Sequence, residues 1–252
     1  MSTLIVPSRF NGPPASGNGG YSCGVVAARF DGPCAVSLRR PVPLDQPLEV
    51  EAGNGLGSGI AGDPDATGTL RVTARGELIA EAVAAPELAP WSGPAVDLEA
   101  ARDATSRFVP PADGFFDHCF VCGRERHDGF CVFAGPIVDE DLVASTWTPP
   151  AWAAGDDGAV RPELVWAVLD CPGYFALHGA DGSLAFLARQ QSTIVAAPRV
   201  GVEYVVVGVP LERSGRKGLA KTAVIDGDGE VLAHAEMVVV EPRPEAMSQK
   251  GG

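Results

Sequence analysis

The sequence lacks the signatures of several large protein classes. None of its apolar runs approaches the ~18 residues that a membrane-spanning helix needs. Its first residues, MSTLIVPSRF, do not combine a basic region with a long apolar stretch. We therefore expect neither a membrane span nor a secretory signal. A Walker-type phosphate loop is also missing, which removes a common kind of nucleotide site.

Basic residues are scarce. Lys and Arg total 19 against 32 Asp and Glu, which gives a formal net charge of −13. Contacts with nucleic-acid phosphates or anionic lipids need a cationic face, so we expect no nucleic-acid or membrane partner. The best local exception is RSGRKGLAK at residues 213–221. It is interpreted either as a solvated hairpin turn or as a binding segment for the phosphates of a soluble cofactor.

Cysteine is also infrequent, with six residues spread over 252. This number favours a reducing compartment over a disulfide framework, and we expect a cytoplasmic protein. Cys119, Cys122, His127 and Cys131 come within one residue of a zinc-knuckle spacing. The segment FCVF, which contains Cys131, reads instead as the start of a strand, and the acidic chain does not suit RNA. We therefore predict no metal site.

The chain reads as two runs of similar elements. Asn18 is a good cap for a short helix in GGYSCGVVAARF, and strands are expected at 34–44, 48–53 and within 68–85. In the second half, a loop leads into two strands within 118–147, and residues 160–177 predict one long buried helix. Further strands are expected at 190–200, 203–214 and within 219–241. A helix followed by strands thus occurs twice.

A local match supports an internal duplication. GELIAEA at 76–82 and GEVLAHA at 229–235 agree at four of seven positions and occupy the last strand pair of each half. Chance similarity of two amphipathic strands is the alternative. Between the halves, the segment 86–114 carries five prolines and no strand periodicity. We place the N-terminal unit at 1–88, the connector at 89–111 and the C-terminal unit at 112–242, with a disordered tail at 243–252.

A helix wrapped by an antiparallel sheet, present twice in one chain, resembles the double hotdog fold. The segments LRRPVPLDQPLEV and CFVCGRERHDGF resemble a strand pair and a Cys-x-x-Cys-Gly lead-in of PaaI-like hotdog thioesterases. Those proteins begin the helix with His-Gly-Gly and carry a catalytic Asp nine positions after the His. Their glycine amides form the oxyanion site, and the Asp comes from the other hotdog. The resemblance implies an α+β protein whose two hotdogs share one continuous sheet.

Each half of this chain keeps one part of that site. Asn18, Gly19 and Gly20 stand where the family has His-Gly-Gly, but Ala27 lies nine positions after Asn18. In the second half, the same frame gives Arg161-Pro162-Glu163 and then Asp170. The resemblance therefore implies one complete composite site, made by Gly19, Gly20 and Asp170, and one empty site. Asn18 in place of His is a departure from the family pattern.

Chemistry supports the same residues. Amides at a helix N-terminus stabilise the negative oxygen of a tetrahedral intermediate, and glycine lets a carbonyl approach closely. Asp170 lies among apolar neighbours, and burial would raise its pKa and suit it to act as a general base or as a nucleophile. Its alternatives are to cap a helix break before Pro172 or to pair with an arginine. We expect further substrate contacts from Tyr21, Tyr174, Arg216 and Lys217.

The function implied by the resemblance is hydrolysis of an acyl thioester, most often of coenzyme A, between the two halves. The substrate would be a small-molecule thioester of coenzyme A or of acyl carrier protein. No cofactor is expected beyond the coenzyme A that forms part of the substrate. A homodimer of double hotdogs is a further expectation. The alternative is a noncatalytic hotdog protein that binds acyl thioesters or lipids, because the exchange of His for Asn would mark lost turnover.

Overall fold

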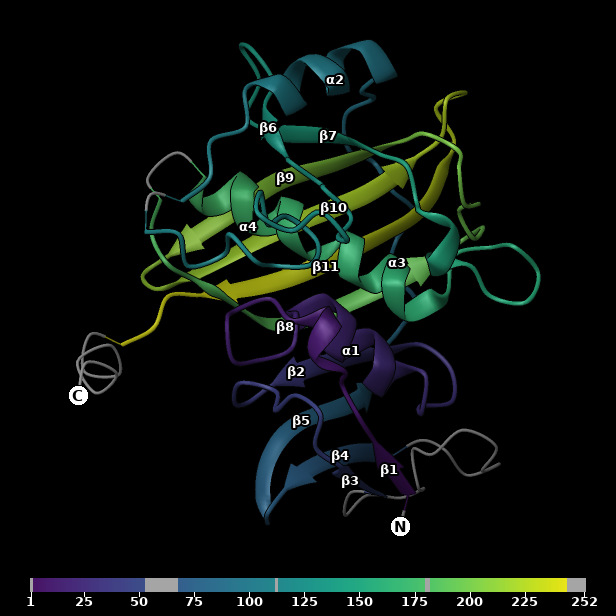
Figure 1. The fold of residues 1–252 in the computed structure, drawn as a ribbon, viewed down its shortest axis with the longest axis vertical. Coiled ribbons are helices and arrows are strands. Elements are labelled where there is room, and N and C mark those ends of the chain that lie inside the picture. Colours follow the sequence, from purple (N-terminus) through teal and green to yellow (C-terminus); the bar gives the residue numbers. More distant parts are fainter. Residues whose placement is uncertain (1, 53–67, 112, 180–181, 244–252) are drawn as a thin grey trace.

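The computed structural model describes residues 2–52, 68–111, 113–179 and 182–243. Their main feature is an 11-stranded antiparallel sheet with the order β1-β3-β4-β5-β2-β8-β11-β10-β9-β7-β6 (Figure 1). The strands are β1 (Ser2–Leu4), β2 (Cys34–Leu38), β3 (Leu48–Ala52), β4 (Thr69–Ala74), β5 (Glu77–Ala84), β6 (Gly135–Pro136), β7 (Val143–Trp147), β8 (Phe186–Ile194), β9 (Tyr204–Ser214), β10 (Lys217–Ile225) and β11 (Val231–Val240). The helices are α1 (Gly19–Ala27), α2 (Leu98–Ser106), α3 (Pro162–Val168) and α4 (Asp170–His178), with 3-10 turns at Ser8–Phe10 and Ala151–Ala153.

The two halves of the sheet mirror each other across one strand pair. Strands β2 and β8 are antiparallel neighbours, with Val36 opposite Gln190. Moving outward, β5, β4, β3 and β1 follow on one side, and β11, β10, β9 and β7 follow on the other. The matched segments GELIAEA and GEVLAHA lie at the corresponding hairpins β4–β5 and β10–β11. One continuous antiparallel sheet therefore joins the halves, as predicted.

The core lies between the sheet and three helices. Helices α1, α3 and α4 pack against one face of the sheet, where alternate strand residues such as Val36, Val206 and Val224 are buried (Figure 1). The intervening residues of the C-terminal strands, including Val205 and Val207, face the other side and pack around α2. The period-2 alternation of the strands thus gives the C-terminal half an apolar layer on both faces.

Helix α2 lies within the predicted connector, where no helix was expected. Its signal is short: Asp97 caps the helix by accepting a hydrogen bond from the Ala100 N–H at 2.8 Å, and Glu99 occupies the first turn. Ala101 and Ala104 are its buried residues. The boundaries of the two units and of the connector stay predictions, and the predicted tail lies outside the described residues from 244 onward.

The prediction of one long helix over 160–177 is wrong. The structure has two helices, α3 and α4, which meet at Leu169. Pro172 has no N–H with which to continue the helical hydrogen bonding toward Val168, and its ring crowds that carbonyl. The helix therefore breaks at this point, and Asp170 becomes the first residue of α4 instead of a mid-helix residue.

Candidate functional site

The site begins with the N-terminus of α1. The Asn18 side-chain oxygen accepts a hydrogen bond from the Tyr21 N–H at 2.9 Å, so Asn18 caps the helix as predicted. The amide nitrogen of the same side chain points toward the sulfurs of Cys119 and Cys171, at 3.9 Å and 4.0 Å. Asn18 is 2 % exposed. The cap is therefore a fixed, buried part of the site.

Close packing of α1 on α3 brings the second half to this helix start. A Cβ atom on Gly20 would lie 2.5 Å from the Trp166 carbonyl oxygen and 2.7 Å from the Asp170 Cβ. A Cβ on Gly24 would lie 2.7 Å from the Glu163 Cα. These distances leave room only for a hydrogen atom. The glycines of α1 are thus required for the contact between the helices.

Gly20 and Asp170 meet through a hydrogen bond, although 150 residues separate them. The Gly20 N–H donates to the Asp170 Oδ2 at 2.8 Å. One of the amides that the helix leaves unpaired at its N-terminus thereby finds a carboxylate partner from the other half. This contact joins the two parts of the predicted composite site, and it occupies the Gly20 amide.

The environment of Asp170 disfavours its charged form. Burial raises the pKa of Asp170 to about 7, aided by the negative charge of the nearby Cys119 sulfur. The hydrogen bonds from Gly20 and from the Asn18 side chain act in the opposite direction. A carboxyl group with such a pKa exchanges protons near neutral pH, as general acid–base catalysis requires.

Gly19 supplies the remaining amide. Within the described chain, the Gly19 N–H makes no hydrogen bond, whereas the Gly20 and Tyr21 N–H groups both do. A Cβ on Gly19 would lie 3.0 Å from the Asp170 Oδ2 and 2.7 Å from the Leu187 Cβ. Among the described residues, the Gly19 N–H is therefore the unpaired amide beside Asp170. Leu187, which sequence reasoning missed, covers this position from β8.

The two predicted tyrosine contacts are mostly buried. Tyr21 stacks on Phe10 with ring centroids 4.1 Å apart, and burial raises its pKa to about 12. Tyr174, one turn after Asp170 on α4, donates from its hydroxyl to the Ser183 carbonyl oxygen at 3.2 Å. Their exposed fractions are 5 % and 8 %. Both rings thus belong to the core around the site, and their contact with a substrate stays a prediction.

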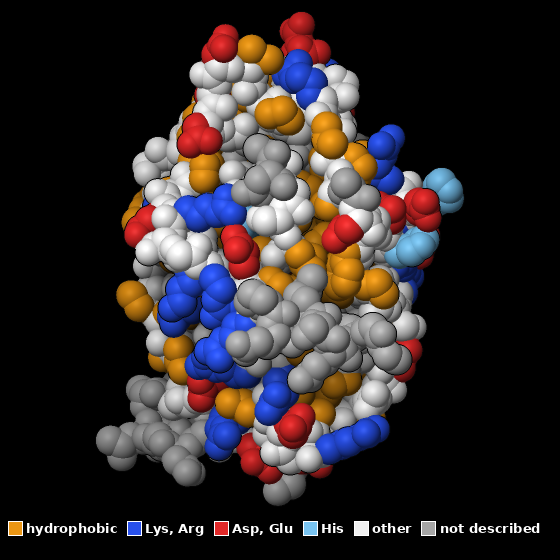
Figure 2. Space-filling view, turned by 90° about the vertical axis from the view of Figure 1, so that its left-hand side faces the viewer, with side chains coloured by type: hydrophobic (Ala, Val, Ile, Leu, Met, Phe, Trp, Pro, Cys, Tyr) orange, Lys and Arg blue, Asp and Glu red, His pale blue; other side chains and the backbone are white. Residues whose placement is uncertain are grey.

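Arg216 and Lys217 lie at the opposite end of α4 from Asp170. They are exposed at the β9–β10 turn, and Gly218 beside them packs against Leu177 near the end of the helix. The Arg216 guanidinium donates to the Glu241 carbonyl oxygen at 2.7 Å. This turn is at the left of Figure 1, on the side that faces the viewer in Figure 2, where basic side chains gather. Arg216 and Lys217 therefore do not line the composite site directly.

The residues of the expected empty site also lie together, and they border a cleft. Its members Ala27 and Pro162 line one cleft of about 250 Å³. Beside it, the Arg161 guanidinium pairs with the Glu163 carboxylate at 3.2 Å. The remaining lining residues are small or apolar for the most part: Gly24, Ala28, Gly32, Pro33, Cys34, Trp166, Ser192 and Ile194. The cleft offers volume without a buried carboxylate.

One motif escaped the sequence analysis. Residues 20–24 read Gly-Tyr-Ser-Cys-Gly, which matches the Gly-x-Ser-x-Gly pattern of serine hydrolases. That pattern works at a sharp turn between a strand and a helix, where the serine is exposed. Here it lies inside α1, and Ser22 is 1 % exposed. The motif therefore does not form a nucleophile elbow.

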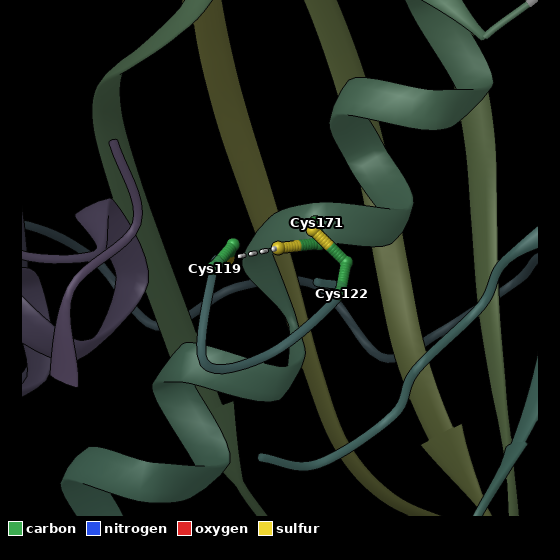
Figure 3. A group of neighbouring side chains, drawn as sticks. All are labelled: Cys119, Cys122 and Cys171. Atoms are coloured by element: carbon green, nitrogen blue, oxygen red, sulfur yellow. Dashed lines mark hydrogen bonds between the residues drawn. The ribbon is translucent and has the colours of Figure 1, made fainter. Parts of the chain in front are cut away.

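The candidate zinc-knuckle set is not assembled. His127 and Cys131 are exposed, whereas Cys119 and Cys122 are buried. Their sulfurs instead meet that of Cys171, and all three lie within 4.8 Å of one another (Figure 3). Sequence reasoning missed Cys171 because it is 49 residues beyond Cys122. Its position directly after Asp170 is the only signal that connects it with the site.

The three thiols of this cluster shift one another's pKa values. The pKa of Cys119 lies well below its usual range because the Cys122 and Cys171 thiols donate hydrogen bonds to its sulfur. The pKa values of those two donors are raised correspondingly. The Cys119 and Cys171 sulfurs are 3.9 Å apart. Asp170 therefore neighbours a buried group of three cysteine sulfurs.

No protein-family model and no curated protein matches the sequence. Solved structures do match. A hotdog-fold protein of unknown function from Alicyclobacillus acidocaldarius is 14% identical, with a TM-score of 0.63 over 96% of this chain and 92% of its own. The tesB protein of Mycobacterium avium subs paratuberculosis is 16% identical, with a TM-score of 0.51 over 89% of this chain and 87% of its own.

These similarities extend over both halves of the chain. Together with the mirrored strand order, they show that the chain has the double hotdog fold, and they confirm the predicted α+β class. Of the helices in the described part of the chain, none has the length and apolar character of a membrane span. The fold leaves the chemistry of the site to be argued from its residues.

Proposed function

We propose that the protein hydrolyses an acyl thioester, with acyl-CoA as the favoured substrate, at the composite site of Gly19, Gly20 and Asp170. The observation that carries the proposal is the hydrogen bond between the Gly20 N–H and the Asp170 carboxylate, at 2.8 Å. It places a buried carboxyl group from one half at the N-terminus of the helix of the other half. This is the arrangement that the resemblance to PaaI-like thioesterases implies.

The two glycine amides have different roles in this proposal. The Gly20 N–H holds Asp170 in place, while the Gly19 N–H donates a hydrogen bond to the developing oxyanion of the tetrahedral intermediate. The positive end of the α1 dipole favours negative charge at both positions. This division modifies the expectation that both glycines bind the oxyanion.

Asp170 acts on the thioester carbonyl carbon either through a water molecule or directly. As a general base it takes a proton from water, which then attacks the carbon. As a nucleophile it forms an acyl-enzyme anhydride that water later cleaves. In both routes the thiolate of the substrate leaves. Support for either role comes from the burial of Asp170, which is 7 % exposed.

In this proposal coenzyme A reaches from Asp170 to the basic turn of Arg216 and Lys217. Helix α4 runs between them over nine residues, a rise of about 14 Å. Arg216 and Lys217 would then bind the phosphates while the thioester lies at Asp170. An acyl group would extend between the two halves along the helices.

Steady-state hydrolysis tests this proposal. A panel of acyl-CoAs with thiol detection identifies the best substrate, and Asp170→Asn then lowers turnover by roughly 10²-fold or more. This change keeps the size of the side chain and an oxygen for the Gly20 N–H. Glu163→Gln is the matched control, because it neutralises a carboxylate at the pseudo-equivalent site and preserves turnover. Circular dichroism checks folding. Equal losses in both variants would contradict the composite site.

Binding without hydrolysis is the second candidate, and the cleft at Ala27 and Pro162 favours it. This cleft provides about 250 Å³ at the site that lacks the carboxylate. A small acyl group would enter an apolar space there without meeting a base. Calorimetric binding of an acyl-CoA with no thiol release would support this function, particularly if bulk introduced by Ala27→Phe abolishes the binding.

A further inference from the structure

Cys119, Cys122 and Cys171 form a sulfur cluster that the proposed hydrolysis does not use. Cys119 and Cys122 lie on the tight loop before β6, and Cys171 lies in the first turn of α4 (Figure 3). Their exposed fractions are 2 %, 6 % and 6 %. The cluster therefore joins a long loop to the helix that begins with Asp170.

The spacing of the sulfurs suits a small thiophilic ion. A Zn–S bond of about 2.3 Å requires sulfur–sulfur separations of about 3.8 Å in a tetrahedral site and about 4.0 Å in a trigonal one. The Cys119 and Cys171 sulfurs are already 3.9 Å apart. All three sulfurs fall within 4.8 Å of one another. Shifts of less than 1 Å, on the scale of ordinary side-chain relaxation, would complete the site.

The surroundings of the cluster stabilise thiolates. The Asn18 side chain is 2 % exposed and lies against this cluster. The Asn18 amide also directs its NH₂ group toward Cys119 and Cys171, because its oxygen is held by the Tyr21 N–H. Donors aimed at sulfur are typical of the outer shell of a metal–thiolate site.

The loop itself is shaped to bring two sulfurs together. The Gly123 N–H donates to the Cys119 carbonyl oxygen at 2.8 Å and closes the turn. A Cβ on Gly123 would lie 2.4 Å from the Asp117 carbonyl oxygen and 2.5 Å from that of Cys119. Glycine is therefore required for this tight Cys-x-x-Cys-Gly turn.

We propose that Cys119, Cys122 and Cys171 bind one thiophilic divalent cation of the Zn²⁺ class. Thiolate ligands select Zn²⁺ or Cu⁺ over hard cations such as Mg²⁺. With three thiolates, Zn²⁺ leaves a net charge of −1 and Cu⁺ leaves −2. The smaller buried charge favours Zn²⁺, since uncompensated charge is costly in a protein interior. Binding displaces the remaining thiol protons into solution.

The protein contributes three ligands to this ion. Among the described residues, the metal-ligating side chains that gather here are these three cysteines alone. The nearest carboxylate, Asp170, is hydrogen bonded to Gly20, and Asn18 presents nitrogen instead of oxygen. A fourth position, if filled, takes a small exogenous ligand such as water. The site differs from the zinc-knuckle set, and proposing it reverses the prediction that the chain has no metal site.

Cadmium provides the probe, because each Cd–thiolate bond adds ultraviolet charge-transfer absorbance. Titration of the reduced, metal-free full chain with Cd²⁺ raises this absorbance up to one ion per chain, and Zn²⁺ removes it by competition. In the Cys122→Ser and Cys171→Ser variants, the absorbance no longer rises to an end point at one Cd²⁺ per chain. Cys131→Ser, which changes an exposed cysteine outside the cluster, retains this end point. The readout does not depend on thioester hydrolysis.

X-ray absorption of the zinc-loaded, unmodified protein keeps the test decisive if a serine variant does not fold. The expected spectrum has three sulfur neighbours at about 2.3 Å. A shell of nitrogen and oxygen alone would overturn the proposal, as would a Cd²⁺ titration without charge-transfer absorbance. Loss of the end point in Cys131→Ser would place the ion elsewhere. Binding of Cu⁺ with no binding of Zn²⁺ or Cd²⁺ would refute the choice of ion.

Discussion

Gly20→Ala tests whether α1 and α3 are as close as the site requires. The added methyl would lie 2.5 Å from the Trp166 carbonyl oxygen and 2.7 Å from the Asp170 Cβ. Both neighbours are fixed by the backbone, so the helices have to separate. Overpacking of this kind costs about 1–3 kcal/mol, and a weakened hydrogen bond to a charged group costs up to about 1.5–3 kcal/mol. Alanine recovers about 0.5–1 kcal/mol as a better helix former.

We therefore expect Gly20→Ala to lower the free energy of unfolding by about 2–4 kcal/mol, a fall of roughly 4–16 °C in Tm for a chain of this size. Urea and thermal unfolding followed by circular dichroism measure both quantities. Gly227→Ala is the matched control, because its nearest neighbour would be 3.8 Å away and little change is expected. Equal stability of Gly20→Ala and the unmodified protein would refute the close contact, and with it the position of Asp170.

Three further results are expected. Asn18→Ala removes the cap on the Tyr21 N–H and costs about 1 kcal/mol in urea unfolding, and Asn18→Ser recovers part of it; an unchanged midpoint in the alanine variant contradicts the cap. Burial lowers the pKa of His234, so the unfolded chain binds the proton more readily, and stability is lost as pH falls from about 6.5 through the lower folded value. In the His234→Gln variant, the midpoint of urea unfolding falls less on acidification than in the unmodified protein. An equal fall in both proteins would refute the effect of burial. The double variant Arg216→Ala, Lys217→Ala raises KM for acyl-CoA several-fold without changing KM for a short thioester that lacks phosphates; equal effects on both substrates argue against phosphate binding.

Local patterns in the sequence were enough to predict most of the fold. The spacing of Asn18, Gly19 and Gly20 before an apolar run specifies a capped helix, and period-2 segments specify the strands. The repeat GELIAEA and GEVLAHA identified equivalent hairpins because both segments pack into the same layer. These features depend on neighbours in the chain, which a sequence displays directly.

The parts that were missed depend on contacts between distant segments. Cys171 joins Cys119 only because the loop before β6 folds over α4, and no spacing rule connects them. The hydrogen bond from the Gly20 N–H to Asp170 depends on the packing of α1 against α3, which decides how the two glycine amides are used. The break at Leu169 is an exception, because the nearby Pro172 indicates it, but the strongly apolar segment around it favoured one long helix.

A crystal structure with a nonhydrolysable thioether analogue of the best acyl-CoA tests the composite site most directly. The account predicts that the group replacing the thioester lies at the N-terminus of α1, beside the Gly19 N–H and the Asp170 carboxylate. The phosphates would lie toward Arg216 and Lys217. A thioester position in the cleft of Ala27 and Pro162, away from Gly19 and Asp170, would contradict it.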